Sequence, residues 1–237
     1  MSLFSALEIK NKAIELGADL VGIADLNRLT GIQTIPETLL DPYSRAVVIA
    51  SAISPDIFEQ IQTEPTPLYA HHYQAANSLL DHINLLLQRE LLRNGYQALA
   101  IPASQAIDKG KWIGHISHKA VAKAAGLGWL GKNLLLITPK YGSRVRLTTL
   151  LTNAPLEADP LLPNRCGSCR RCQEACPAQA IKGTTWEDHP ESREDALNLA
   201  ACTQKLTSDF SVLPGIGKNI CGICIKVCPW GTDANRP

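Results

Sequence analysis

Apolar residues in the first two thirds of the chain change repeatedly between the spacing of a helix and the spacing of a strand. Residues 69–93 carry leucine and isoleucine at helical spacing and end at Asn94 and Gly95, which predicts one long helix. The same signals predict shorter helices over residues 5–16 and 117–125. Apolar runs predict strands over residues 19–24, 45–51, 97–101, 133–138 and 145–152. Interleaved helices and strands of this kind indicate a layered α/β or α+β core.

The cysteines divide the chain in two. All eight lie after residue 165, so we expect a core over residues 1–158 and a small cysteine-rich domain over residues 159–237. With 45% hydrophobic residues and no apolar run near the length of a membrane-spanning helix, the sequence predicts no membrane partner. The net charge of +1 gives no general reason to expect nucleic acid.

The cysteine spacing is typical of a protein that holds two iron–sulfur clusters. The first run is C-x2-C-x2-C-x3-C-P, and the second lacks one cysteine, which the isolated Cys202 is available to replace. In two-cluster ferredoxins the fourth cysteine of such a run ligates the other cluster. We therefore expect one [4Fe-4S] cluster on the Cys228 group, consisting of Cys166, Cys169, Cys172 and Cys228. We expect the second on the Cys202 group, consisting of Cys176, Cys202, Cys221 and Cys224.

Structural zinc and disulfides are the alternatives for these cysteines. Zinc rarely uses a three-membered run closed by C-x3-C-P, and the first residues indicate an amphipathic helix rather than a secretory signal. Iron–sulfur clusters need reduced thiolates, so the pattern predicts a cytoplasmic, oxygen-poor setting.

Two further features lie between the predicted core helices and the cysteines. Residues 109–146 contain eight lysines and arginines and no acid, which favours an anionic ligand nearby; the alternative is a solvated face balanced by acids elsewhere. Three glycines at positions 126, 128 and 131 permit close approach of the backbone to a flat group. The alternative there is a tight turn with Trp129 packed in the core.

Residues 118–137, 142–143 and 150–152, together with the cysteine tail, resemble the epoxyqueuosine reductases. These are cobalamin-dependent enzymes with two [4Fe-4S] clusters, related more distantly to reductive dehalogenases. The resemblance spans residues 69–230 and implies an α+β protein, in which a nitroreductase-like α/β core precedes a small bacterial-ferredoxin-like domain. It also implies an oxidoreductase that passes low-potential electrons through both clusters to a bound corrinoid, which reduces a substrate.

The resemblance and the glycine-rich, basic stretch together suggest which residues contact a corrinoid. Glycines would lie against the macrocycle, and basic side chains would meet the phosphate of its nucleotide tail. The expected contacts are His72, Tyr73, Ser117, Lys119, Gly126, Leu127, Gly128, Trp129, Gly131, Lys132, Asn133, Gly142 and Ser143.

The family places an acidic proton donor before the glycine-rich stretch, but residues 112–119 contain no carboxylate. His115 and His118 are therefore the expected catalytic donors, because imidazole releases a proton near neutral pH. Asp108 is the next candidate. The alternative for each histidine is a hydrogen-bonded structural residue.

Epoxyqueuosine reductases also carry a C-terminal extension of helical repeats, whereas this sequence stops nine residues after Cys228. On that ground we do not expect tRNA as a partner. The expected partners are a low-potential electron donor, such as ferredoxin or flavodoxin, and a small-molecule or corrinoid substrate. The alternative function is a non-enzymatic electron carrier or a reductive activator of a corrinoid protein.

Overall fold

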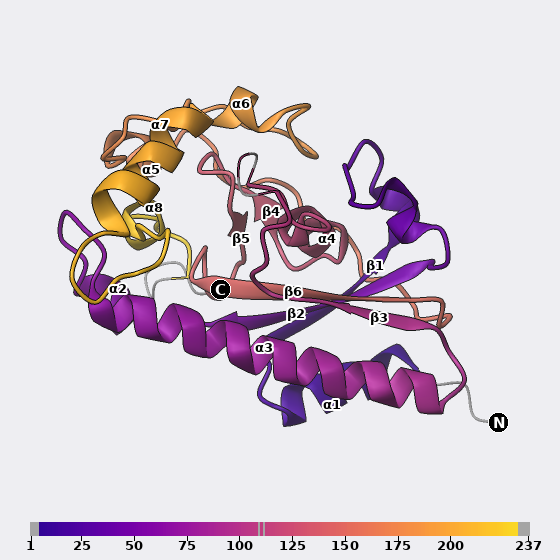
Figure 1. Ribbon diagram of the computed structural model, residues 1–237. Coiled ribbons are helices and arrows are strands. Elements are labelled where there is room, and N and C mark those ends of the chain that lie inside the picture. Colours follow the sequence, from indigo (N-terminus) through magenta and orange to yellow (C-terminus); the bar gives the residue numbers. More distant parts are fainter. Residues whose placement is uncertain (1–4, 109, 111, 232–237) are drawn as a thin grey trace. The chain divides into compact units, whose positions relative to one another are not determined.

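The computed structural model describes residues 5–108, 110 and 112–231 (Figure 1). The chain forms two compact units, each assembled from separate stretches. The first unit consists of Met1–Ser51, Ala76–Leu127 and Arg146–Leu162, and the second of Ala52–Ala75, Gly128–Val145 and Pro163–Pro237. The predicted mixture of helices and sheet is confirmed. Division into domains at residue 158 stays a prediction.

The helices and strands have the following bounds. The α-helices are α1 (Ala6–Glu15), α2 (Pro55–Glu59), α3 (Pro67–Arg93), α4 (His118–Ala124), α5 (Arg171–Glu174), α6 (Arg193–Ala196), α7 (Leu199–Gln204) and α8 (Ile223–Lys226). The strands are β1 (Leu20–Asp25), β2 (Arg45–Ala52), β3 (Ala98–Ile101), β4 (Trp129–Leu130), β5 (Leu136–Ile137) and β6 (Val145–Thr152). Short 3₁₀ turns, η1 (Leu26–Arg28) and η2 (Glu37–Leu40), and a π-helical segment, η3 (Lys205–Phe210), complete the set.

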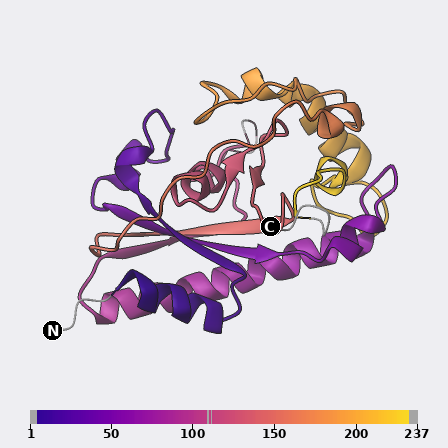
Figure 2. The same ribbon diagram turned by 180° about the vertical axis from the view of Figure 1, so that it is seen from behind.

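A four-stranded sheet in the order β1-β2-β6-β3 is the centre of the first unit. The pairs β1–β2 and β3–β6 are both antiparallel, with Ile23 opposite Val47 and Ala100 opposite Leu150. Helices α1 and α3 cover one face of this sheet, and α4 lies on the other (Figures 1 and 2). The first unit is therefore built around one sheet, in which the pairs β1–β2 and β3–β6 are antiparallel.

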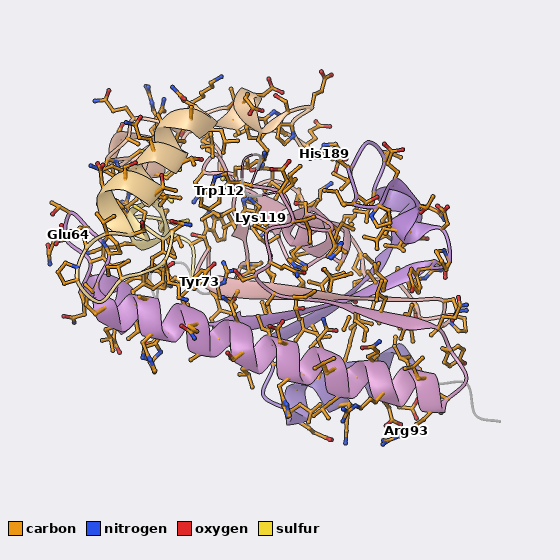
Figure 3. The ribbon with its side chains drawn as sticks, viewed as in Figure 1. Glu64, Tyr73, Arg93, Trp112, Lys119 and His189 are labelled. Carbon is orange, nitrogen blue, oxygen red and sulfur yellow. The ribbon has the colours of Figure 1, made fainter. Side chains whose placement is uncertain are left out.

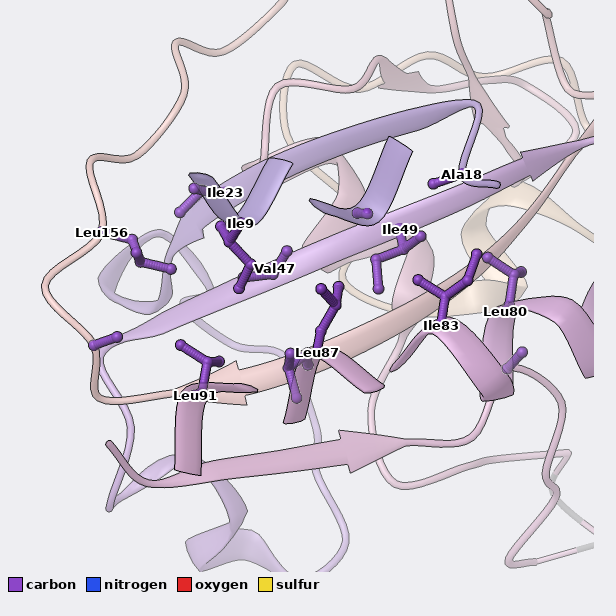
Figure 4. Close-up of a cluster of buried hydrophobic side chains, with 14 residues drawn as sticks. Ile9, Ala18, Ile23, Val47, Ile49, Leu80, Ile83, Leu87, Leu91 and Leu156 are labelled. Atoms are coloured by element: carbon purple, nitrogen blue, oxygen red, sulfur yellow. The ribbon is translucent and has the colours of Figure 1, made fainter. Parts of the chain in front are cut away.

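The core of the first unit lies between the sheet and its two covering helices (Figure 4). Leu80, Ile83, Leu87 and Leu91 line one side of α3 at helical spacing, and each is fully buried. A helix of this length with one apolar stripe is stabilised mainly by that packing. The stripe is the same pattern that predicts the helix from the sequence.

The deeply buried stripe of α3 makes a stability prediction possible. We expect Leu87→Ala to lower the free energy of unfolding by about 2–5 kcal/mol, because it removes buried methyl groups and leaves a cavity. Leu85 is on the same helix but 51% exposed, so Leu85→Ala should change stability by less than about 0.5 kcal/mol. Chemical denaturation of both variants measures the difference, and equal losses would contradict this assignment of the core.

The second unit has little regular structure. Its short strands β4 and β5 form a two-stranded antiparallel hairpin with Trp129 opposite Ile137. Its remaining elements are α2, the first turns of α3, and the short helices α5 to α8 with η3. Figure 3 labels Glu64 in the loop before α3, Tyr73 near the start of that helix and Arg93 at its end.

Within the part of the chain that the structure describes, no helix is both long and apolar enough to cross a membrane.

Candidate iron–sulfur and cofactor site

The eight cysteines all belong to the second unit, where Cys228 is buried and the others are partly exposed. Three of them lie in short helices: Cys172 in α5, Cys202 in α7 and Cys224 in α8. These helices are only four to six residues long, too short to show a helical period in the sequence. Among the described residues, no three His, Cys, Asp or Glu side chains converge on a single metal ion.

The electrostatic neighbours of the thiols reproduce the two predicted groups. Burial, with smaller contributions from Cys228, Cys166 and Cys169, raises the pKa of Cys172 to about 11. Burial likewise raises the pKa of Cys221 to about 11, with Cys202 and Cys176 adding to the effect. For both thiols, the neighbouring cysteines belong to their own predicted group. The assignment of all eight cysteines to two clusters stays a prediction.

One interaction links the two groups. Burial raises the pKa of Cys224 well above its ordinary value, and the contributing neighbours include Cys172 as well as three members of its own group. Unligated thiols in such a setting stay protonated at neutral pH. Thiolate ligands must lose their protons to bind a metal, so binding of iron to these cysteines would release protons.

Polar side chains fix the loop that carries the first cysteine run. Asn164 Oδ1 accepts a hydrogen bond from Cys166 N at 2.9 Å, and its Nδ2 donates to the carbonyls of Leu130 and Trp186, both at 3.0 Å. Lys132 Nζ donates to the Cys169 carbonyl at 2.9 Å. Sequence analysis missed Asn164. Its position two residues before a cysteine is typical of an Asx turn, and that signal could have found it.

Trp129 and Arg144 lie beside the Cys228 group. Trp129 is 1% exposed and packs with Ile137, Cys228 and Cys166, and its ring meets that of Trp230 edge to face at 4.8 Å. Its Nε1 is buried and has no hydrogen-bond partner among the described residues. The Arg144 guanidinium donates to the Trp230 carbonyl at 3.1 Å.

The glycine-rich stretch is packed against the protein itself. A Cβ on Gly128 would collide with the Ile137 carbonyl, and one on Gly126, whose φ is 69°, would collide with the Pro160 carbonyl. Side chains of Ile137 and Asn133 close the space beside Gly131. These contacts agree with the alternative of a tight turn with a buried Trp129. Contact between these glycines and a corrinoid stays a prediction.

The other predicted corrinoid contacts are divided between the units. Ser117, Lys119, Gly126 and Leu127 belong to the first, and the remaining residues of that set to the second. Ser117 caps α4 by accepting a bond from Ala120 N at 3.4 Å, and Lys119 follows in the same helix (Figure 3). Ser143 is 3% exposed, and its Oγ has no partner among the described residues.

The basic stretch does not form one exposed face. Lys109 and Lys111 lie outside the described residues. Lys123, Lys132 and Arg144 are each less than 10% exposed, so these charges face the interior rather than solvent. Lys132 and Arg144 are committed to the loops around the first cysteine run and Trp230, as described above. Sequence spacing alone could not separate these interior cations from the others.

His118 has the environment of a structural histidine. Its Nε2 lies 2.9 Å from the Pro102 carbonyl, which can only accept, and its Nδ1 lies 2.7 Å from Thr149 Oγ1. Desolvation, opposed in part by the hydrogen bond to Pro102 and assisted by Arg146, lowers the pKa of His118 to about 4. The residue is partly exposed, but both ring nitrogens have hydrogen-bond partners. The structure therefore argues against His118 as a proton donor at neutral pH, contrary to the prediction.

The lowered pKa of His118 predicts a pH dependence of stability. The unfolded state binds a proton at this residue below about pH 6.5, whereas the folded state does so only below about pH 4. Because the unfolded state then holds more protons, the free energy of unfolding should fall as pH decreases through this window. Denaturation at several pH values should show a shallower decline in His118→Gln than in the wild type; parallel curves would contradict the assignment.

His115 is held differently. Its Nδ1 donates to the Ile35 carbonyl at 2.7 Å, and no partner of its Nε2 is found among the described residues. Asp108 pairs through its backbone with Ile113 in the loop that leads to His115. His115, His118 and Asp108 all belong to the first unit. Of the two histidines, His115 keeps a nitrogen available for proton transfer.

Residues 165–231 match the family described as the 4Fe-4S double cluster binding domain. The chain thus contains a double-cluster iron–sulfur domain, as the cysteine spacing predicts.

The resemblance to epoxyqueuosine reductases is also confirmed. A segment of 124 residues is 38% identical to an epoxyqueuosine reductase of Listeria monocytogenes, covering 49% of this chain and 30% of that protein. A segment of 131 residues is 37% identical to an epoxyqueuosine reductase of Synechocystis, and this match covers 52% of this chain and 43% of that protein.

Solved structures extend the likeness to nearly the whole chain. An epoxyqueuosine reductase with an epoxyqueuosine-modified tRNA stem loop superimposes with a TM-score of 0.63 at 25% identity, covering 97% of this chain and 66% of that one. A catabolic reductive dehalogenase superimposes with a TM-score of 0.74 at 21% identity, covering 95% and 32%. The latter match shows a shared fold. The chain spans less than half of the curated relatives above and about two thirds of the solved reductase.

The prediction that tRNA is not a partner is wrong. The relatives are epoxyqueuosine reductases, and the solved enzyme that covers 97% of this chain holds a tRNA stem loop. The prediction rested on the position at which the sequence stops, and that position says nothing about what the described residues bind.

Proposed function

We propose that this chain is a cobalamin-dependent iron–sulfur reductase that acts on epoxyqueuosine in tRNA. The proposal is supported above all by the double-cluster domain over residues 165–231 in a chain that resembles epoxyqueuosine reductases. Reduction of an epoxide to an alkene consumes two electrons and two protons and releases water. Two clusters supply a route for single electrons of low potential.

The corrinoid would supply a strongly reducing cobalt centre, and the protein would hold it and deliver protons. Ser143 is a candidate contact for this ligand, because its Oγ is buried and has no hydrogen-bond partner among the described residues. A polar group of a bound molecule that forms a hydrogen bond with this hydroxyl would stabilise it. The amide side chains of a corrinoid provide such groups. His115 would hold and release the proton through Nε2, since its Nδ1 is fixed on the Ile35 carbonyl.

Binding and turnover can be tested separately. Anaerobically purified protein should contain about eight irons and eight sulfides per chain. Added cobalamin should change its visible spectrum to that of a base-off form, and Ser143→Ala should weaken this binding while leaving iron content unchanged. Gly128→Val is a poor probe of binding, because its side chain would strike the Ile137 carbonyl and disturb the β4–β5 hairpin.

Turnover is measured with an epoxyqueuosine-containing tRNA stem loop, a chemical reductant and cobalamin. We expect the nucleoside to lose one oxygen atom, as measured by mass spectrometry. Cobalamin binding without turnover on tRNA would reject this substrate. Absence of both binding and turnover in protein with full iron content would instead favour the electron carrier, for which the two clusters alone are sufficient.

A further inference from the structure

The two cysteine groups differ in the side chains around them. Both groups receive backbone N–H groups: Gln173 and Trp230 donate to Cys172 and Cys228, whereas Ile223 and Ala180 donate to Cys221 and Cys176. Backbone hydrogen bonds to sulfur raise the reduction potential of a cluster. Because this kind of hydrogen bond occurs in both groups, the difference is sought in the side chains.

Charged side chains do distinguish them. Arg144 is 3% exposed, and burial lowers its pKa; Cys228 is the anionic neighbour that opposes this most, followed by Glu59, which lies in an ion pair with Lys226. The corresponding cation near the other group is Lys205, beside Cys221, and Asp209 neutralises it at 2.7 Å. A buried cation without an ion pair at hydrogen-bond distance therefore accompanies the Cys228 group, whereas the cation beside the Cys202 group is paired with Asp209.

Trp129 adds a neutral donor on the same side. A buried indole N–H without a partner is destabilising, so a hydrogen-bond acceptor is expected when the clusters are bound. Trp129 belongs to the same buried hydrophobic cluster as Cys228, and Cys166 packs against that cluster, so the indole lies close to two of the expected iron ligands. Trp230 forms the other half of the aromatic pair, and its Nε1 is not among the buried atoms that lack a partner.

We propose that Trp129 and Arg144 raise the reduction potential of the cluster on the Cys228 group above that of its neighbour. The indole N–H donates a hydrogen bond to a cluster sulfur, and the guanidinium compensates the additional negative charge of the reduced cluster. Both effects stabilise the reduced form, so this cluster takes up the first electron. This inference concerns the clusters alone and holds for any substrate that the chain reduces.

Redox titration followed by electron paramagnetic resonance tests the proposal. Cys202→Ala provides a background that retains only the cluster on the Cys228 group. In that background, Trp129→Phe keeps an aromatic ring and removes the indole N–H donor, and Arg144→Gln removes the positive charge. We expect each to lower the reduced-to-oxidised ratio at a fixed potential by about tenfold, equivalent to about 59 mV for a one-electron couple. Arg144→Lys should restore most of the loss.

Trp230→Phe is the matched control, because it changes the partner ring and leaves the Trp129 donor in place. Its potential should equal that of the parent. Unchanged potentials in Trp129→Phe and Arg144→Gln would overturn the proposal, as would an equal shift in Trp230→Phe.

A measurement on the unmutated protein covers the case in which a variant loses its cluster. Labelling tryptophan with ¹⁵N and recording hyperfine spectra of the reduced protein should reveal a weak nitrogen coupling from a hydrogen-bonded indole. The first electron added should produce the spectrum that carries this coupling. Absence of any indole coupling, or its appearance only with the second electron, would reject the assignment.

Discussion

We expect Cys202→Ala to remove one cluster and leave the other intact. Cys202 is the member of its group that comes from α7, and no other cysteine is available to replace it. Iron and sulfide content should fall from about eight to about four per chain, and multi-electron turnover should be lost because the relay is interrupted. Iron analysis and electron paramagnetic resonance measure the outcome.

Thr203→Ala is the control for Cys202→Ala, since it changes the next residue of the same helix and should leave iron content unchanged. Loss of both clusters in Cys202→Ala, or retention of both, would contradict the two groups of four. Zinc in place of iron in the wild type would contradict the cluster assignment altogether.

We expect His115→Gln to lower reductive turnover by about 10²-fold with cluster content unchanged. Glutamine can preserve a hydrogen bond to the Ile35 carbonyl but cannot release a proton, and a positioned general acid contributes about 10²–10⁴-fold. Single-turnover rates with saturating substrate measure this effect without interference from binding.

His82→Gln, on the exposed side of α3, is the activity control and should behave as wild type. A larger loss in His118→Gln than in His115→Gln would reject the choice of His115. If neither variant loses activity, the proton comes from another group, with Asp108 next to be tested.

The extent to which the sequence predicts this fold depends on element length. Helix α3 and strand β6 are long enough to display their period, and both are predicted within two residues of their bounds. Helix α2 and the four-residue helices α5, α6 and α8 are too short for any period, and the analysis missed them. Among them, α6 is also stabilised locally by a capping box between Ser192 and Asp195.

The site divides in a similar way. Cysteine spacing is a local signal that predicts a double-cluster domain, and residues 165–231 match the model of such a domain; the ligand set of each cluster stays a prediction. The difference between His115 and His118 is not local, because the partners of His118 are Pro102 and Thr149, which are distant in the sequence. Trp129 and Cys228 pack in one buried cluster although about 100 residues separate them in the sequence. A sequence motif, which covers only neighbouring residues, could not predict this packing.

The interleaving of the two units has a consequence for how the protein is made. Residues 52–75 and 128–145 leave the ribosome well before the cysteines, yet they belong to the same unit as the cysteines. During synthesis the surroundings supplied by Trp129 and Arg144 must therefore wait for the segment that completes them, and cluster insertion becomes a late step of maturation. A fragment that begins at residue 159 would carry every cysteine but neither of these residues. Such a fragment is expected to assemble clusters whose potentials differ from those of the intact chain, which limits its use as a stand-alone redox module.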